Sequence, residues 1–302
     1  MIDPARPSRV IAHVRGTEPG PTLILVGGVH GNEPAGIIAA RSVLADLPVT
    51  GVYGEVIALV GNSRAVAAGV RYVDRDLNRL WLPEQLAEAR AGAAGVELTE
   101  LAELADAIDR VRERAAGTIY VLDMHTTSAE GFPFAVVGPT AAHRTFASAF
   151  PLPGIRGLEE TLDGTLTRYL GSLGCVTLAV EGGQSATTAA AANLEAMVTL
   201  ALEAAGVVAP VPGAAEARLH LVRVRGDLPH AIEVVERHSI DPFSEFVMEP
   251  GFANIQRTPA GTLLARDRTG EVRAPFDGIL LLPLYQRQSD DGFFYGREAG
   301  DG

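Results

Sequence analysis

The chain has 302 residues, of which 47% are hydrophobic and 21% are charged, and its formal net charge is −12. This balance supports a large apolar core and offers no basic surface for nucleic acid or for an anionic membrane. All 25 cationic side chains are arginine, which excludes mechanisms that depend on a lysine nucleophile, a Schiff base or a P-loop lysine.

Short apolar runs alternate with longer helical patterns through about residue 205. In chain order we predict a strand at 22–26, a helix at 34–47, a strand at 56–60, a helix around 101–111, strands at 119–122, 134–137 and 176–180, and a helix around 194–202. This alternation predicts an α/β fold with a mostly parallel mixed sheet and helices on both faces. Because such sheets bind ligands at the carboxyl ends of their strands, the residues that follow the strands are the candidates for a site.

The composition changes after the last of these helices. Segment 209–215 is rich in proline, glycine and alanine, as linkers are, and residues 217–224 are predicted to form a strand. Glycine-containing turns then separate short apolar segments at 260–261, 269–270 and 277–278. We therefore predict a catalytic domain over residues 1–208 and a small β-rich domain over residues 216–302.

The single cysteine, Cys175, cannot form an internal disulfide or a thiolate metal cluster. Its apolar neighbours predict a core position at the start of a strand, and the alternative is a catalytic thiol. The first residues lack the features of a signal peptide, and the apolar runs are too short to cross a bilayer. We expect a cytoplasmic protein without a membrane or nucleic-acid partner, and leave open whether it forms a homo-oligomer.

Three candidate metal ligands follow two of the predicted strands. His30 and Glu33 come after the first strand, in the segment Gly-Gly-Val-His-Gly-Asn-Glu, and His125 ends the strand that begins at Ile119. A His-x-x-Glu pair at a strand-to-helix turn can aim both side chains at one point. Two histidines and one carboxylate leave a coordination position open for water, which is typical of catalytic zinc. Taken singly, each residue would be an ordinary polar surface group.

Two further carboxylates stand near these strand ends. Asp123 lies two residues before His125 and points the same way along a strand, which suits either a partner for this histidine or a cap at the strand end. Glu181 follows the apolar run 176–180, where a carboxylate is costly unless it is paired or functional. We expect Glu181 to act as general base and acid towards zinc-activated water and the leaving amine. The alternative is a solvated turn residue.

The segment 71–79, Arg-Tyr-Val-Asp-Arg-Asp-Leu-Asn-Arg, is dense in charge, and its spacing alone is that of a solvated loop. Asn78 and Arg79 are nevertheless well suited to bind a carboxylate, because a guanidinium group offers a bidentate fork.

Four segments, taken together, resemble the succinylglutamate desuccinylase/aspartoacylase family, which is related to the zinc carboxypeptidases: 27–33, 71–79, 123–127 and 180–183. Their order and approximate spacing match the family over roughly residues 20–205, and 274–278 resembles its β domain more loosely. The resemblance implies a zinc carboxypeptidase-like fold with one zinc ion per chain, held by His30, Glu33 and His125.

The resemblance also implies roles for residues that contact the substrate. Arg71 would polarise the scissile carbonyl and stabilise the oxyanion. Asn78 and Arg79 would hold one substrate carboxylate, and Arg168 would bind a second one. Tyr295 is the candidate for a substrate-contacting tyrosine near the C-terminus.

We therefore expect zinc-dependent hydrolysis of the amide bond of an N-acyl amino acid or a similar small amide that bears a carboxylate. The chain departs from the aspartoacylases at Gly164, where they carry a tyrosine. One alternative is a carboxypeptidase that acts on peptides, which needs an open cleft. Another is a catalytically silent metal- or ligand-binding protein, against which the presence of both Glu181 and Arg71 argues, since binding alone needs neither.

Overall fold

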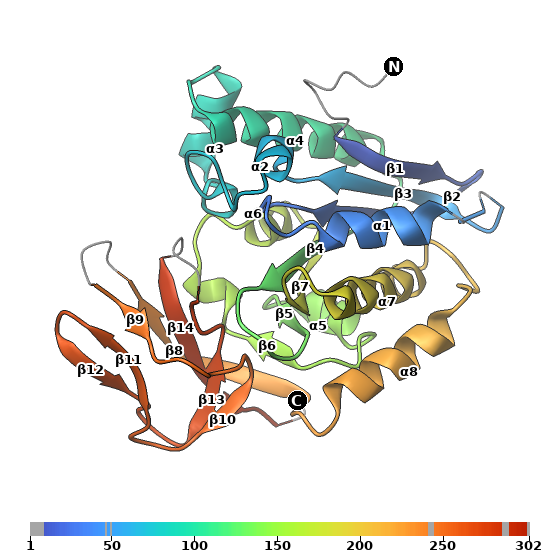
Figure 1. Cartoon of the computed structure of the whole chain (residues 1–302). Helices are drawn as coiled ribbons and strands as arrows, with labels where there is room; N and C mark the ends of the chain where they lie inside the picture. Colours follow the sequence, from blue (N-terminus) through green and yellow to red (C-terminus); the bar gives the residue numbers. More distant parts are fainter. Residues whose placement is uncertain (1–8, 46, 49, 241–244, 286–289, 301–302) are drawn as a thin grey trace.

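A computed structural model describes residues 9–45, 47–48, 50–240, 245–285 and 290–300 (Figure 1). Most of its strands belong to one mixed sheet, in the spatial order β1 (Val10–Arg15), β3 (Tyr53–Val60), β2 (Glu18–Gly27), β4 (Ile119–Thr127), β7 (Val176–Gln184), β5 (Phe134–Val137), β6 (Gly154–Arg156), β8 (Ala231–Ser239), β14 (Asp291–Glu298), β13 (Gly278–Leu281) and β10 (Gln256–Thr258). The central strands β3, β2, β4 and β7 run parallel, whereas β1 and β5 pair antiparallel with β3 and β7. The α/β fold with a mostly parallel mixed sheet is confirmed.

Helices cover both faces of the central strands (Figure 1). On one face lie α1 (Ala35–Ala45), α5 (Ala141–Ala147), α7 (Thr188–Ala204) and α8 (Ala214–Arg225). On the other lie α3 (Pro83–Arg90), α4 (Val96–Arg114) and α6 (Leu166–Ser172). Short helices α2 (Ser63–Ala68), η1 (Leu77–Arg79) and η2 (Glu159–Thr161) sit in the connections.

The alternation of side chains along each strand divides the core between these faces. Leu23 and Leu25 of β2 pack with the α1 and α7 layer, and Ile24 and Val26 pack with the α3 and α4 layer. Cys175 is buried in the part of the core that packs with α3 and α4, one residue before β7, as the sequence predicted.

Residues 217–224 form most of helix α8, so the strand predicted there is wrong. Apolar residues at 217, 219 and 221 gave the appearance of alternation. The buried residues of the helix are Ala214, Ala217 and Leu221, which recur at three and four positions and pack beside α7.

The C-terminal region is rich in strands, as predicted. The turn at 260–261 precedes β11 (Leu263–Asp267), and the turns at 269–270 and 277–278 lead into the first residues of β12 and β13. Besides the strands that join the main sheet, it forms a small antiparallel sheet of β12 (Gly270–Arg273), β11 (Leu263–Asp267) and β9 (Val247–Met248). Because β8 pairs in parallel with β6, the C-terminal strands continue the main sheet. The division at 1–208 and 216–302 remains a prediction.

Across the described part of the chain, no helix combines the length and the apolar character that a bilayer crossing requires. The cytoplasmic location remains a prediction from the sequence.

Candidate active site

The three predicted metal ligands lie together at the carboxyl ends of β2 and β4. His30 and Glu33 occupy the turn between β2 and α1, and His125 is near the end of β4. All three side chains are buried, and one ligand atom from each lies within 4.8 Å of the others. The turn is tightly packed, because a Cβ atom on Gly31 would lie 2.0 Å from the Ala65 carbonyl carbon. The backbone thus fixes where the two turn ligands stand.

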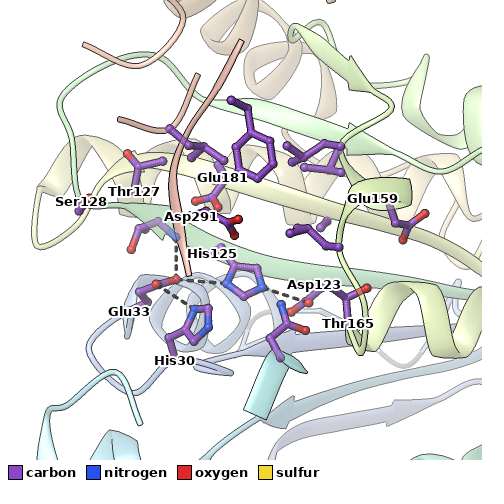
Figure 2. Close-up of a pocket in the computed structure, with 18 of the residues that line it drawn as sticks. His30, Glu33, Asp123, His125, Thr127, Ser128, Glu159, Thr165, Glu181 and Asp291 are labelled. Carbon is purple, nitrogen blue, oxygen red and sulfur yellow. Dashed lines mark hydrogen bonds and ion pairs between the residues drawn. The ribbon is translucent and has the colours of Figure 1, made fainter. Parts of the chain in front are cut away.

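Each histidine ring lies between two carboxylates. Figure 2 shows His125 between Glu33 and Asp123, and His30 beside Glu33. The Nδ1 atoms of His30 and His125 lie 3.0 and 3.2 Å from the two carboxylate oxygens of Glu33. Nε2 of His30 lies 3.1 Å from Asp76 Oδ1, and Nε2 of His125 lies 3.0 Å from Asp123 Oδ2. The second of these contacts is an ion-pair distance without hydrogen-bond alignment. Asp123 is therefore a partner of His125, one of the two roles left open by the sequence.

Burial and neighbouring charge act in opposite directions on these groups. Burial alone would raise the pKa of Glu33, but the charge of His30 and the hydrogen bonds from both imidazoles outweigh it and lower the pKa. Burial would lower the pKa of His125, but Asp123 and Glu33 raise it well above its ordinary value. Asp76 has its pKa held well below the usual range by His30 and Arg71, against the effect of burial.

Around the three predicted metal ligands, carboxylates outnumber arginine side chains. Arg71 contacts Glu33 at 3.4 Å and Asp76 at 3.1 Å. Four carboxylates gather in this region: Glu33, Asp76, Asp123 and Glu181. Two imidazole nitrogens and a carboxylate oxygen form a donor set that zinc prefers, and each ring is oriented by a further carboxylate, as is usual around ligating histidines. The residues present therefore fit a zinc ion.

Glu181 lies on β7, in register with His125 on the neighbouring strand. Its side chain is partly accessible from the pocket, but its Oε2 atom is buried and has no hydrogen-bond partner among the described residues. Removal from water raises the pKa of Glu181 to about 8, although the charge of His125 acts in the opposite direction. A carboxyl group with such a pKa can both accept and return a proton near neutrality.

The segment 71–79 is held in place by Glu97, a buried residue in the first turn of α4. The Glu97 carboxylate accepts hydrogen bonds from the backbone N–H groups of Val73, Asp74 and Arg75 at 2.7, 2.8 and 3.1 Å. It also accepts one from Asn62 Nδ2 at 3.1 Å. The loop that carries Arg71 and Arg79 is therefore anchored to the helix by one side chain.

Asn78 and Arg79 both line the pocket, and each also has a partner within the protein. Asn78 Oδ1 accepts a hydrogen bond from the Leu166 N–H at 2.9 Å, at the start of α6. Arg79 Nη2 lies 3.1 Å from Asp291 Oδ2, and the other oxygen of Asp291 accepts from Arg237 Nε at 2.6 Å. Two arginines and one aspartate leave one positive charge over, which is enough for one substrate carboxylate.

A cavity of about 150 Å³ connects these residues with a largely apolar region. Its floor is the face of the sheet that carries Asp123, His125 and Glu181, and η2, α6 and the C-terminal region enclose it. The C-terminal region contributes Leu282, Pro283, Leu284, Asp291 and Phe294. The site is therefore a covered pocket, with walls from the α/β region and from the C-terminal region.

Arg168 does not reach this pocket. Helix α6 turns Leu166, Thr167 and Leu170 inward, and Arg168 faces solvent, where it pairs with Asp163 at 2.7 Å. Its side chain is 48% exposed. The structure therefore places Arg168 outside the pocket lining, where Thr167 stands instead, and gives no support to the second-carboxylate role that the resemblance implied.

Tyr295 is also directed away from the pocket. It is fully buried on the opposite side of β14, where its hydroxyl lies 2.8 Å from the Thr258 carbonyl oxygen and 3.0 Å from that of Phe276. Because side chains alternate along a strand, the neighbouring Phe294 faces the pocket. The aromatic contact expected from segment 293–295 thus falls on Phe294.

Sequence reasoning missed several residues of the site. Asp76 stands in the noted segment 71–79, but nothing in the spacing distinguishes it from Asp74, which instead accepts from the Val96 N–H. Glu159 and Asp291 lie in segments without a recognisable motif. Only the packing of η2 and β14 around the pocket reveals them.

This chain is similar in sequence and in fold to known proteins. Residues 19–205 match the family described as succinylglutamate desuccinylase/aspartoacylase catalytic domain. A probable aspartoacylase from Synechococcus sp. (strain CC9605) is 31% identical over 128 residues, which are 42% of this chain and 40% of that protein. An N-acyl-aromatic-L-amino acid amidohydrolase (carboxylate-forming) from Xenopus tropicalis is 32% identical over 109 residues, 35% of this chain and 34% of the relative. The matches therefore span less than half of these relatives.

Among solved structures, a succinylglutamate desuccinylase/aspartoacylase from Rhodobacter sphaeroides superposes with a TM-score of 0.72 at 22% identity. The superposition covers 96% of this chain and 88% of that one, and so extends over the C-terminal region as well. At this identity the likeness concerns the fold.

Proposed function

Because this chain belongs to the succinylglutamate desuccinylase/aspartoacylase family, we propose that it is a zinc-dependent amidohydrolase that cleaves an N-acyl amino acid or a similar small amide bearing a carboxylate. One observation carries the proposal. The buried His30, Glu33 and His125 cluster and the poised carboxyl group of Glu181 face the same covered pocket.

Zinc is the cofactor that we propose for this cluster, with one ion per chain. His30, Glu33 and His125 would hold it, and Asp76 and Asp123 would keep the two imidazole rings oriented. When bound, a zinc ion lowers the pKa of a coordinated water to about 7 and polarises a carbonyl group.

The remaining chemistry belongs to side chains of the pocket. Glu181 accepts a proton from the attacking water, whose oxygen bonds to the amide carbon, and returns that proton to the nitrogen as the carbon–nitrogen bond breaks. Arg71 donates hydrogen bonds to the carbonyl oxygen as negative charge develops there. The Nδ2 amide of Asn78 and the guanidinium group of Arg79 bind the substrate carboxylate. The products are a carboxylic acid and a free amine.

Two alternatives are less well supported. A carboxypeptidase acting on peptides needs an open cleft, whereas Leu282 to Leu284 and Phe294 cover this pocket and favour a small substrate. A silent binding protein would need neither Glu181 nor Arg71 beside the metal ligands.

A direct test is a mass-spectrometric screen of the zinc-loaded protein against acetyl-, succinyl- and formyl-amino acids, with a short peptide panel alongside. We expect release of a free amino acid from at least one acylated compound and none from peptides. Cleavage of peptides alone would favour the carboxypeptidase. No cleavage of either panel by fully zinc-loaded protein would favour the silent binding protein.

A further inference from the structure

The pocket has a second charged end that the proposed chemistry does not use. Glu159, the first residue of η2, lines the pocket and is 7% exposed. Its carboxylate lies against Gly138, since a Cβ atom built there would be 2.9 Å from Glu159 Oε2. Among residues that the structure describes, no arginine or histidine forms an ion pair with it within 4.0 Å, although the His143 ring also lies against Gly138. Burial raises the pKa of Glu159, whereas a hydrogen bond from the Thr167 hydroxyl group and the charges of His143 and Arg168 act in the opposite direction.

Glu159 lies at the far end of the pocket from the metal ligands (Figure 2). The antiparallel register explains this separation. Phe134 of β5 pairs with Glu181, Val137 pairs with Leu178, and Gly138 follows further in the same direction. The metal ligands thus lie at the carboxyl end of the parallel strands, and Glu159 lies several residues towards their amino end.

The wall between the two ends is apolar. It includes Val136, Leu158, Leu162, Ala179, Leu284 and Phe294. Both arginines that line the pocket, Arg71 and Arg79, belong to the segment beside the metal ligands. Beside Glu159 the lining includes Thr167, whose hydroxyl group donates a hydrogen bond to the Glu159 carboxylate.

Among the described residues, the loop nearest to the far end contributes no cation to the pocket lining. Arg168 is turned outward and bonded to Asp163 and to the Leu162 carbonyl oxygen. Gly164 has a φ of +70°, and a Cβ atom on it would lie 2.3 Å from the Arg79 carbonyl oxygen. No side chain fits at this position without displacing the loop that carries Arg79.

We propose that Glu159 is a specificity-determining residue that rejects anionic groups, so that the preferred substrates are N-acyl compounds with one carboxylate and not two. This inference rests on the proposed function, in which Asn78 and Arg79 hold that one carboxylate. A second carboxylate would extend along the apolar wall towards Glu159, where little water remains to screen the repulsion. Like charges brought together at a binding surface strongly disfavour association. A neutral amide in the same place can instead donate a hydrogen bond to Glu159.

Matched substrate pairs that differ only in this charge provide the test. They are acetyl-aspartate with acetyl-asparagine, acetyl-glutamate with acetyl-glutamine, and succinyl-alanine with its terminal carboxamide. The third pair covers the case in which the acyl group points to the far end. For the wild-type enzyme we expect kcat/KM to favour the amide member of at least one pair by about tenfold or more, because a site with an unmatched buried polar group discriminates strongly.

The isosteric variant Glu159→Gln assigns the preference to this residue. We expect it to reduce the preference by about tenfold, mainly through a higher kcat/KM for the acid member. Glu160→Gln, at the exposed neighbouring position, is the matched control and should leave the preference unchanged. A wild-type enzyme that favours the acid members or treats the pairs equally would overturn the proposal, whether or not the variant folds. A preference that persists in a folded Glu159→Gln variant would overturn the role of Glu159.

Failure of the proposed function can be told apart from failure of this inference. If the zinc-loaded protein cleaves no N-acyl compound, the enzymatic proposal falls, and calorimetric binding of the same pairs still tests the selectivity. Tighter binding of the amide members, lost in Glu159→Gln, supports the inference. Equal binding, or tighter binding of the acids, contradicts it.

Discussion

Glu97 offers a test of how the site is held together, because it contacts no part of the pocket lining yet supports the loop at 71–79. Its buried carboxylate accepts three backbone N–H groups and the Asn62 amide. A buried donor left without its acceptor costs about 1–3 kcal/mol. Val73, Asp74 and Arg75 are exposed, however, so water can reach part of the freed backbone. We therefore expect Glu97→Ala to lower the free energy of unfolding by about 2–4 kcal/mol, and Glu97→Gln by about half as much, because one acceptor oxygen remains.

Urea unfolding at constant zinc concentration measures this loss, and Glu113→Ala is the control. Glu113 is an exposed residue of the same helix, and its substitution should change stability by no more than about 0.5 kcal/mol. Arg71 and Arg79 belong to this loop and would be displaced with it. Because small displacements in a catalytic site commonly lower the rate, kcat/KM of the folded Glu97→Ala variant should fall by about tenfold or more. A Glu97→Ala variant that loses less than about 1 kcal/mol and keeps its kcat/KM would refute the anchoring role.

Three further predictions concern the site itself. We expect elemental analysis to find about one zinc per chain in wild-type protein and much less in His125→Ala, because two ligands hold zinc poorly. Full occupancy in the variant would contradict the ligand assignment. Glu181→Gln should keep its zinc and its melting temperature while kcat falls by at least ~10²-fold, and near-normal turnover would give Glu181 a structural role. If Asn78 and Arg79 bind the substrate carboxylate, the α-carboxamide of a good substrate should have a much lower kcat/KM. The corresponding loss of transition-state stabilisation should be about 1–3 kcal/mol or more. Equal kcat/KM values for the acid and its carboxamide would exclude this contact.

The strand-end residues could be predicted from the sequence because their positions follow from local rules. Where an apolar run forms a strand of a parallel sheet, the residue that follows it lies at the carboxyl edge of that sheet. His30, Glu33, His125 and Glu181 are all brought to one pocket in this way.

Residues whose role depends on distant packing could not be predicted in the same way. Glu159 and Asp291 reach the pocket only because η2 and β14 fold over it. The roles of Arg168 and Tyr295 were predicted from the resemblance alone. Arg168 faces away from the pocket because of its position on helix α6. Tyr295 faces away because side chains alternate along β14, which directs Phe294 to the pocket. The strand predicted at 217–224 failed because a short apolar alternation fits both a strand and a helix.

The parallel pairing of β6 with β8 limits how this protein can be divided or recombined. Three residue pairs join the strands, with Ile155 opposite Ile232 at the centre. A chain cut after residue 208 would expose that edge of β6, whose unpaired backbone groups are a template for aggregation. It would also uncover Phe134 and Ile155, which pack against Ile232 and Phe294. Exchanging C-terminal regions between relatives, as a route to new specificities, therefore requires an incoming strand that matches the register of β6 as well as a new set of pocket residues.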